Sequence, residues 1–424
     1  MGMRKLTISQ DRGILVGLDI GTTKICCIIA QQSTNDGLKL LGAGIGSSAG
    51  IDKGMVVNIE EAVDSIESAV SKAESMAGQR VNNAYIGISG DHIRGINTQG
   101  AIAISKNGHS SVYDHEITNQ DINRALELAR AVSLPIDREI LHTLPQEYIV
   151  DDQRNIKDPS GMVARRLEAK IHLVTGAITA AKNMRKCVEE AGIDVNALIY
   201  QPLASAAATL EPTEKKLGVV LVDIGGGTTD VSVFYNSGVR HSAVIALGGN
   251  NITNDIAMML NVSLDDAEDI KIKYGSAKAA MASTDLEFEL SHQAGEEPRI
   301  ISEHEVSRYV EARMEEMFQL VNREILRADV ESPISFSIVL TGGGALLKNI
   351  TSLAEEVLGG RVKIGIPKGL NSLVEVAASP VYATAIGLIQ YGEQIAAEFN
   401  IGNREKFTGD RTITKLKHWF AGMF

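Results

Sequence analysis

Cysteine is scarce in this sequence. Only Cys26, Cys27 and Cys187 occur among its 424 residues, so we expect no disulfide framework. Cys26 and Cys27 are adjacent within the apolar run 25–30, which predicts a buried strand in a protein of a reducing compartment. Because no CxxC pair or cluster of His and Cys accompanies them, a metal site built on cysteine is not expected either.

Long hydrophobic segments are missing as well. The first residues, MGMRKLTISQDRG, are polar, so we expect no secretory signal peptide. No run in the sequence approaches the ~20 apolar residues that a membrane-spanning helix requires. We therefore expect a cytoplasmic protein, and any contact that it makes with a membrane should be peripheral.

The sequence also lacks an excess of positive charge. Its formal net charge is -12 at pH 7, and neither half carries the basic stripe that neutralises nucleic-acid phosphates, so we expect no nucleic-acid partner. What remains is typical of a globular protein, with 44% hydrophobic and 22% charged residues. The length of the chain favours two lobes over a single hydrophobic core.

Two similar motifs rich in glycine and threonine occur, one in each half of the chain. Residues 17–24 read GLDIGTTK and residues 222–230 read VDIGGGTTD. Each motif contains an aspartate at a strand end, Asp19 or Asp223, where it could hold hydrated Mg²⁺. Glycines let backbone N–H groups approach phosphate oxygens, and threonine hydroxyls add donors. The candidate phosphate-binding residues are Gly21, Thr22, Thr23, Lys24, Gly225, Gly226, Gly227, Thr228 and Thr229.

Glycine-rich turns also occur in proteins for reasons other than phosphate binding. Tight β-hairpin turns are also rich in glycine, but two copies that each follow an aspartate favour phosphate binding. Neither motif is a Walker loop, because GxxxxGK[ST] is absent, and neither is a Rossmann fingerprint, because each turn leads into a strand. A third turn follows a predicted strand and opens a predicted helix, so it either contacts a nucleotide or is a structural turn. Its residues are Gly342, Gly343, Gly344 and Ala345.

Hydrophobic periodicity predicts that each half of the chain forms a lobe of strands and helices. Near residues 90–155, short strands, a helix over 119–132 and several turns indicate an inserted subdomain, after which a strand at 169–174 returns to the first lobe. The second lobe begins near residue 196 and repeats the strand-turn-strand unit at 218–234. Further strands are predicted at 14–19, 25–30, 38–46, 84–89 and 335–340, and helices over 59–76, 179–191, 251–260, 264–274, 303–328 and 346–358.

The last thirteen residues predict an amphipathic helix after a polar linker. Apolar side chains recur at helical spacing, and Lys415, Lys417 and His418 lie on the flanks and the polar side. Trp419, the only tryptophan, suits a membrane interface. The helix could instead dock on the protein's own core, but the linker at 400–411 favours the membrane. The candidate membrane-binding residues are Ile413, Leu416, Lys417, Trp419, Phe420, Met423 and Phe424.

Together these features resemble the superfamily of actin, sugar kinases and heat-shock chaperones, and more closely the FtsA family of actin-like bacterial cell-division proteins. The similarity covers essentially the whole chain. It is most specific at Asp158-Pro-Ser-Gly-Met162, Leu167-Glu168, His172, Val174-Thr175, Pro202-Leu-Ala-Ser205, Ala267-Glu-Asp-Ile-Lys271 and Tyr274-Gly275. The resemblance implies an α/β, actin-like, two-lobed ATPase fold with duplicated ribonuclease-H-like cores, an inserted subdomain called 1C and a C-terminal amphipathic helix.

The resemblance also implies domain boundaries. The first lobe (1A) would comprise residues 1–88 and 167–195, interrupted by subdomain 1C at 89–166. The second lobe would comprise core 2A and subdomain 2B, followed by a closing helix that returns to the first lobe, the linker and the membrane helix. These segments are 196–245 and 331–380 for 2A, 246–330 for 2B, 381–399 for the closing helix, 400–411 for the linker and 412–424 for the membrane helix.

The same resemblance assigns roles to particular residues. Asp19, Gln201 and Asp223 would surround Mg²⁺ and the attacking water, with the two aspartates as metal ligands and Gln201 and Asp223 as the catalytic residues. Glu268 and Lys271, with residues 342–345, would contact the adenosine of ATP or ADP. The alternative for Glu268 and Lys271 is an ion pair on a solvated helix face. Because residue 201 is Gln where chaperone relatives have Glu, the capacity for hydrolysis is left open.

The function implied is that of an ATP-binding protein that polymerises and tethers the FtsZ ring to the cytoplasmic membrane through its terminal helix. Its partners would be FtsZ, further copies of itself, an anionic membrane surface and other division proteins that meet subdomain 1C. A small-molecule kinase would have no use for the amphipathic tail. A chaperone-type ATPase would need a β-rich peptide-binding domain that this sequence lacks, and the tail favours FtsA over a pilus-assembly relative.

Overall fold

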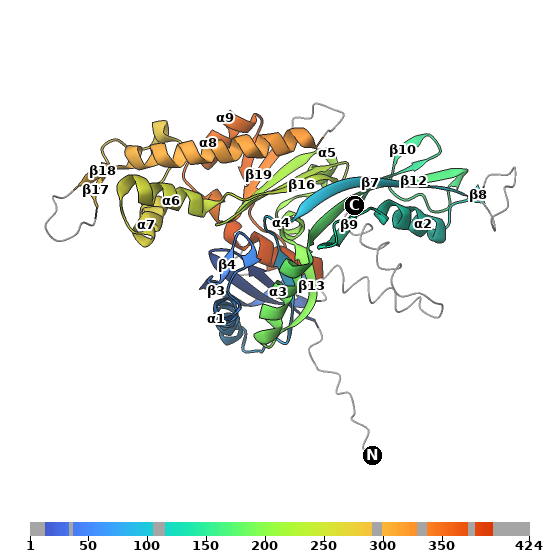
Figure 1. Cartoon of the computed structure of the whole chain (residues 1–424), viewed down its shortest axis with the longest axis horizontal. Helices are drawn as coiled ribbons and strands as arrows, with labels where there is room; N and C mark the ends of the chain where they lie inside the picture. Colours follow the sequence, from blue (N-terminus) through green and yellow to red (C-terminus); the bar gives the residue numbers. More distant parts are fainter. Residues whose placement is uncertain are drawn as a thin grey trace, which may run out of the picture.

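The structure, a computed structural model, describes residues 13–33, 37–104, 115–290, 299–328, 337–371 and 378–392. Figure 1 shows one lobe below the other, with a further domain that extends sideways from their junction. This arrangement confirms the predicted two-lobed α/β architecture with an insertion. The predicted linker and terminal helix lie outside the described residues.

The first lobe is built on a mixed sheet. Its strands are β1 (Ile14–Ile20), β2 (Lys24–Ser33), β3 (Gly37–Ser47), β6 (Asn83–Ile88), β13 (Asp194–Tyr200) and β21 (Leu370–Asn371). β1, β2 and β3 are antiparallel neighbours, whereas β6 and β13 continue the sheet in parallel on the other side of β1. Within the described residues the order is β13-β6-β1-β2-β3-β21. The predicted hairpin of β1 and β2 is therefore confirmed.

Two helices, α1 (Ile59–Ala77) and α3 (Ile178–Glu190), cover one face of this sheet. The helix α1 begins after Asn58, whose side chain accepts a hydrogen bond from the Glu61 N–H. It ends at Gly78, which has the left-handed conformation that favours glycine at this position. Its buried residues recur at helical spacing and face the sheet.

The opposite face is covered by α4 (Gln201–Thr209) and by the helical residues 383–392. These two helices touch closely, because a Cβ atom at Gly387 would lie 1.8 Å from the Ala204 carbonyl oxygen. Only glycine permits this approach. The chain therefore returns from the second lobe to pack on the first, next to the strand ends where the candidate site is expected.

The second lobe repeats the sheet pattern of the first. Its strands are β14 (Val219–Ile224), β15 (Thr229–Tyr235), β16 (Gly238–Ile245), β19 (Ser337–Thr341) and β20 (Val362–Ile364). The first three are antiparallel neighbours, and β19 and β20 follow β14 in parallel. In the described part of the chain the order is β16-β15-β14-β19-β20. This shared topology confirms the expected duplication of one core.

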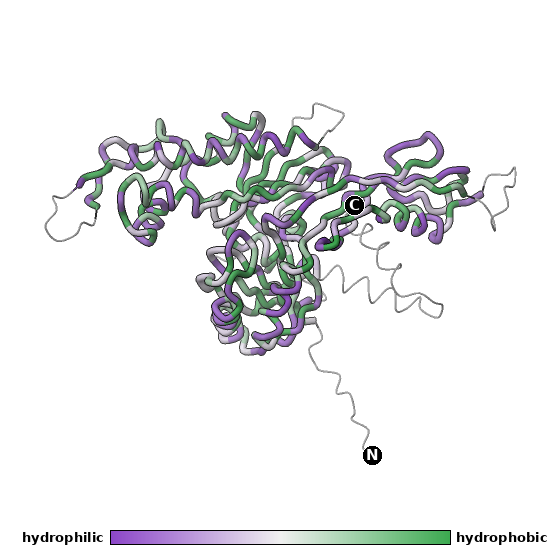
Figure 2. The backbone as a smooth tube through the Cα atoms, in the orientation of Figure 1, coloured by the Kyte–Doolittle hydropathy of each residue, from purple (hydrophilic) through white to green (hydrophobic). Residues whose placement is uncertain are grey.

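Helices and short strands complete the second lobe. The main core of this lobe joins its sheet to α6 (Gly249–Leu260), α7 (Leu264–Tyr274), α8 (Glu303–Arg327) and α9 (Ile350–Leu358). Hydrophobic and hydrophilic residues alternate along α8 in Figure 2, as expected of a helix with one buried face.

Smaller elements occur throughout the described part of the chain. They are β4 (Ile51–Asp52), β5 (Met55–Val56), α5 (Pro212–Leu217), η1 (Ala279–Met281), β17 (Glu287–Glu289), β18 (Ile300–Ser302), η2 (Gly343–Leu346) and η4 (Pro380–Tyr382).

The inserted domain has a sheet of its own. Its elements are β7 (Arg94–Ala103), β8 (His115–Glu116), α2 (Asn119–Arg130), β9 (Arg138–Val150), β10 (Gln153–Ile156), β11 (Val163–Ala164) and β12 (Arg166–Ala177). Among the described residues the main sheet has the order β10-β9-β12-β7, and α2 packs against it. The helix predicted at 119–132 is therefore present.

The expected end of the insertion is corrected by this topology. We expected residues 169–174 to return to the first lobe, but they belong to β12, which pairs with β7 and β9 inside the inserted sheet. The chain returns to the first lobe with α3 and β13 instead. A buried apolar strand has the same residue pattern in either sheet, so periodicity could not assign β12 to the correct one.

Candidate functional site

The two glycine-threonine motifs meet face to face between the lobes. The β1–β2 turn is closed by a hydrogen bond from the Gly21 N–H to the Lys24 carbonyl oxygen (3.0 Å), and the β14–β15 turn by the same bond from Gly225 to Thr228 (2.9 Å). The turns also touch, because a Cβ atom at Gly226 would lie 2.3 Å from Thr23 Cγ2. The two motifs therefore form one site, and glycine is required where they meet.

An aspartate lies at the end of each central strand, as predicted. Asp19 is 6% exposed and accepts a hydrogen bond from Gln201 Nε2 (3.0 Å). Asp223 is 8% exposed and accepts one from Ser205 Oγ (2.6 Å). Burial raises the pKa of Asp223; the Ser205 hydrogen bond opposes this, and the charge of Asp19 adds to it. A cation between the strands would relieve this repulsion.

Lys24 connects the first loop to the returning chain. Its Nζ donates to the Val381 carbonyl oxygen (2.5 Å) and lies 3.4 Å from Asp19 Oδ2. Burial by itself would lower the pKa of Lys24, but the negative charges nearby, that of Asp19 above all, raise it overall. The ammonium group therefore keeps its charge at neutral pH, as a partner for phosphate oxygens must.

The structure adds residues to the site that the sequence did not reveal. Ser89, at the end of β6, donates a hydrogen bond to Asp230 and so joins the two lobes. Burial raises the pKa of Asp230 to about 8. Thr384 lies beside Asp223, with its Oγ1 3.4 Å from Oδ2. Asp230 closes the second motif and could have been found there, and Ser205 ends the motif Pro202-Leu-Ala-Ser205 of the family resemblance. Ser89 and Thr384 come from remote segments with no local pattern.

The third glycine-rich turn packs against the second loop. Gly342 has a φ of 81°, and a Cβ atom there would lie 2.3 Å from Asp223 Oδ1. A Cβ atom at Gly344 would lie 2.3 Å from Ile224 Cγ2. The turn leads into a 3-10 helix, η2, and the α-helix predicted at 346–358 begins four residues later than expected, at Ile350. The positive φ at Gly342 does not fit helical geometry.

A cavity of about 330 Å³ adjoins the loops and brings the remaining predicted residues together. Glu268 and Lys271 lie on α7 at its edge, where Lys271 Nζ is 2.6 Å from Glu268 Oε2 and 2.9 Å from Thr253 Oγ1. The side chain of Lys271 is 13% exposed and that of Glu268 is 42% exposed, so the lysine end of this ion pair is shielded and its glutamate end is solvated. The cavity combines apolar walls with glycine edges, and its lining includes Thr23, Lys24, Gly225, Gly226, Ile252, Ile272, Met314, Gly343, Gly344 and Leu347.

The carboxylates beside the two loops are the candidate ligands for Mg²⁺. Among the described residues, no three His, Cys, Asp or Glu side chains are grouped closely enough to hold a metal ion by themselves. Asp19 and Asp223 nevertheless line one gap with both loops. Two carboxylates suit Mg²⁺, which usually takes one or two of them and completes its shell with water and substrate phosphates. The residues present therefore fit a magnesium ion bound together with a phosphate ligand.

Other predicted residues lie away from this site. His172 is buried and forms hydrogen bonds to Asn97 Oδ1 and Ser242 Oγ, both 2.7 Å, which confirms that it is a satisfied strand histidine. The candidate membrane residues at 412–424 lie outside the described residues. No helix in the described part of the chain is long and apolar enough to span a bilayer.

The duplicated sheets and the facing loops define an actin-like protein. Among solved structures, the PilM-PilN type IV pilus biogenesis complex matches with a TM-score of 0.62 at 17% identity, over 89% of this chain and 98% of that one. MreB5 of Spiroplasma citri bound to AMPPNP matches with a TM-score of 0.56 at 14% identity, over 92% and 99%. These likenesses confirm the predicted actin-like fold.

The chain belongs to the FtsA family of cell division proteins. A family model described as cell division protein FtsA matches residues 220–387, and one described as the SHS2 domain inserted in FTSA matches residues 90–175. The sequence is 39% identical over 422 residues to the cell division protein FtsA of Pseudomonas aeruginosa. This match covers 98% of this chain and 99% of that protein. The second model ends within β12, in agreement with the corrected boundary of the insertion.

Proposed function

We propose that this protein binds ATP with Mg²⁺ between its lobes. The observation that carries the proposal is the contact between two phosphate-type loops with an aspartate beside each. Residues 21–24 and 225–229 would hold phosphates, Asp19 and Asp223 would hold the metal, and residues 342–345 with Glu268 and Lys271 would surround the adenosine. Magnesium would neutralise phosphate charge in this site.

Nucleotide in this protein would control assembly more than it drives fast chemistry. Gln201 is a neutral amide and donates its Nε2 hydrogen to Asp19, so it can orient a water but cannot accept its proton as a general base. Asp223, the other proposed catalytic residue, is held by Ser205. We expect slow hydrolysis at most, with ATP binding holding the two lobes together for polymerisation.

The proposed cellular role is to tether FtsZ polymers to the cytoplasmic face of the membrane at the division site. The support is the family membership, together with the amphipathic pattern of residues 412–424. A single short interfacial helix binds membranes weakly and reversibly, whereas a row of such helices binds cooperatively. Polymerisation of this chain would supply that row, and the inserted domain would meet other division proteins.

Co-sedimentation with anionic vesicles tests the tether. The full chain should sediment with the vesicles, and a variant without residues 412–424 should stay in solution. Trp419→Glu and His418→Glu are a matched pair, because both add a negative charge at neighbouring positions but only the first falls on the apolar face. We expect the first variant to lose binding and the second to keep most of it. Equal binding by the truncated and full chains would refute the tether.

The same samples separate membrane binding from assembly. Vesicle sedimentation with and without ATP, followed by electron microscopy, should show more bound protein and filaments on the vesicles when Mg-ATP is present. Filaments of equal number without nucleotide would contradict the proposed control by ATP, while leaving the tether itself intact.

A further inference from the structure

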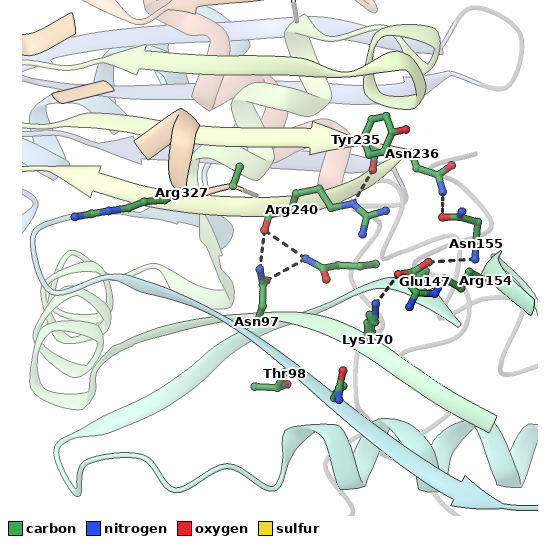
Figure 3. A pocket seen from close by; sticks show the side chains of 13 residues that line it. Asn97, Thr98, Glu147, Arg154, Asn155, Lys170, Tyr235, Asn236, Arg240 and Arg327 are labelled. Carbon is green, nitrogen blue, oxygen red and sulfur yellow. Dashed lines mark hydrogen bonds and ion pairs between the residues drawn. The ribbon is translucent and has the colours of Figure 1, made fainter. Parts of the chain in front are cut away.

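A second cavity lies between the inserted domain and the second lobe, and we call it the junction cavity. Its volume is about 810 Å³. Strands β7, β9, β10 and β12 form one wall, and β16, the β15–β16 turn and the end of α8 form the other (Figure 3). Among the described residues, none that lines this cavity also lines the nucleotide cavity or the gap between the phosphate loops. It is therefore a separate site.

Positive charge dominates the lining of this cavity. Arg154 and Lys170 come from the inserted domain, and Arg240 and Arg327 come from the second lobe. The one carboxylate in the described lining is Glu147, which lies 3.1 Å from Lys170 Nζ and accepts a hydrogen bond from the Asn155 N–H (3.1 Å). Of the four cations, Lys170 is paired with Glu147, and Arg327 is paired with Glu324 just outside the lining (2.5 Å). Arg154 and Arg240 therefore contribute most of the positive charge of the cavity, inside a protein whose net charge is -12.

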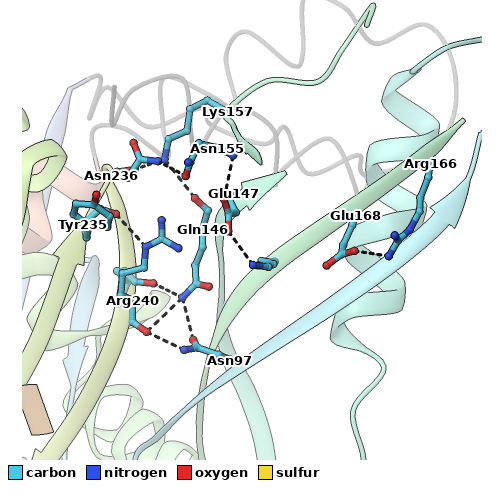
Figure 4. A network of polar contacts seen from close by, with 12 residues as sticks. Asn97, Gln146, Glu147, Asn155, Lys157, Arg166, Glu168, Tyr235, Asn236 and Arg240 are labelled. Carbon is cyan, nitrogen blue, oxygen red and sulfur yellow. Dashed lines mark hydrogen bonds and ion pairs between the residues drawn. The ribbon is translucent and has the colours of Figure 1, made fainter. Parts of the chain in front are cut away.

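Amide side chains fix the two walls relative to each other. Gln146 of β9 is 6% exposed, and its Nε2 donates to Asn97 Oδ1 (3.0 Å) and to the Val239 carbonyl oxygen (2.8 Å). Asn97 Nδ2 in turn donates to the Arg240 carbonyl oxygen (3.0 Å), so the network crosses from one domain to the other (Figure 4). A cavity held in this way is organised before any ligand binds, which lowers the entropic cost of binding.

Lys157 lies next to the cavity, and its pKa responds to burial and to the positive charge nearby. Lys157 Nζ donates to the carbonyl oxygens of Asn236 and Gln146, and so also bridges the two domains. Burial, together with a smaller effect of the positive charge of Arg240, lowers the pKa of Lys157 to about 8. An anion in the cavity would stabilise both cations.

We propose that the junction cavity binds a compact polyanion that carries several phosphate groups. The cations lie on both walls and come from four elements, and Figure 3 shows Arg240 extending from the second lobe towards the inserted domain. Convergent cations suit a compact ligand, whereas an acidic peptide needs a linear track with side-chain pockets. The volume falls in the range of small-molecule sites, about 300–1,000 Å³.

Such a ligand would act as a bridge between the two domains. The inserted domain is joined covalently to the first lobe at both its ends, yet its polar contacts in this network are with the second lobe. A polyanion held by cations from both walls would strengthen this connection. The surface of the inserted domain would then follow the movements of the second lobe.

Titration of the full chain with inorganic triphosphate, followed by calorimetry at low salt, tests this proposal. The protein carries Lys24→Ala throughout, because this change removes the ammonium group beside the phosphate loops and so weakens phosphate binding there. Paired Arg154→Gln and Arg240→Gln substitutions should weaken triphosphate binding by about tenfold or more, since each removes charge-assisted hydrogen bonds. Arg308→Gln is the matched control, because Arg308 lies on α8 as Arg327 does but is exposed and does not line the cavity.

The outcomes are distinguishable from those of the ATP proposal. Retained ATP-analogue binding in the paired variant without Lys24→Ala, with weakened triphosphate binding, supports a separate junction site. No triphosphate binding, equal binding by the paired variant, or equal weakening by Arg308→Gln overturns it. Binding of a poly-glutamate peptide in place of triphosphate would overturn it in favour of a peptide ligand. If the paired variant unfolds early in a thermal melt, Arg240→Gln alone replaces it, because this change alters only one wall of the cavity.

Discussion

Asp19 and Asp223 occupy equivalent strand ends but have different partners. Asp19 accepts hydrogen bonds from an amide and lies near an ammonium group, whereas Asp223 accepts them from hydroxyls. The motifs were predicted from the sequence because glycine, threonine and aspartate act through local geometry. The contact between Ser205 and Asp223 could not be predicted, because Ser205 reaches Asp223 from α4 only after the lobes pack together.

Asp223→Ala should remove most Mg-dependent ATP affinity, because the variant lacks one of the two carboxylates proposed to hold the metal. Ser205→Ala should weaken the affinity by about 10–100-fold, the usual effect of losing a group that orients a metal ligand. Calorimetry with ATP, with and without Mg²⁺, measures both. Full Mg-ATP affinity in Asp223→Ala would remove this residue from the metal site.

His172 should make the stability of the protein depend on acid pH. Burial first, and His241 second, lower the pKa of His172 to about 3. Below the ordinary pKa of 6.5 the unfolded chain binds a proton that the folded chain excludes, so stability falls as pH decreases towards 3. By pH 4.5 the loss in the free energy of unfolding should be about 2–3 kcal/mol.

Urea unfolding at pH 7 and pH 4.5 measures this loss. The free energy of unfolding should change less between the two pH values in His172→Gln than in the parent protein, and His115→Gln serves as the control. An unchanged pH dependence in His172→Gln would contradict the assignment.

At the scale of elements, glycine decides how closely α1 approaches the first sheet. A Cβ atom at Gly44 would lie 2.0 Å from the Ala69 carbonyl oxygen, whereas one at Gly46, two residues along β3, would lie 3.6 Å from its nearest neighbour. The helix and the strand were both predicted from periodicity. Their distance was not, because it depends on which glycines face the helix.

Gly44→Ala should therefore destabilise the protein by about 1–3 kcal/mol, the usual cost of overpacking a core. Gly46→Ala should cost less than about 1 kcal/mol, because its methyl group meets neighbours at an ordinary contact distance. Urea unfolding of the two variants measures the difference in free energy. Equal stability of the two variants would mean that α1 can move away from β3 without cost.

At the scale of the whole molecule, tight membrane binding by residues 412–424 should depend on assembly of the protein. Residues 412–424 fused to a monomeric fluorescent protein should bind anionic vesicles weakly. The same segment on a tetrameric carrier should bind at least about a hundredfold more tightly, since linked sites gain from effective concentration. Vesicle flotation at matched segment concentration compares the two. Equal affinity would indicate that a single helix suffices and that polymerisation is not needed for tethering.

The sequence by itself determined the two phosphate-type loops, the strands beside them, the duplicated lobes and the presence of an insertion. These depend on local chemistry and on periodicity, which neighbouring residues define. Only the tertiary structure decided that β12 belongs to the inserted sheet, that Ser89, Ser205 and Thr384 join the site, and that cations from two domains meet in one cavity. Each of these depends on contacts between segments far apart in the chain, and such contacts leave no pattern in the order of the residues.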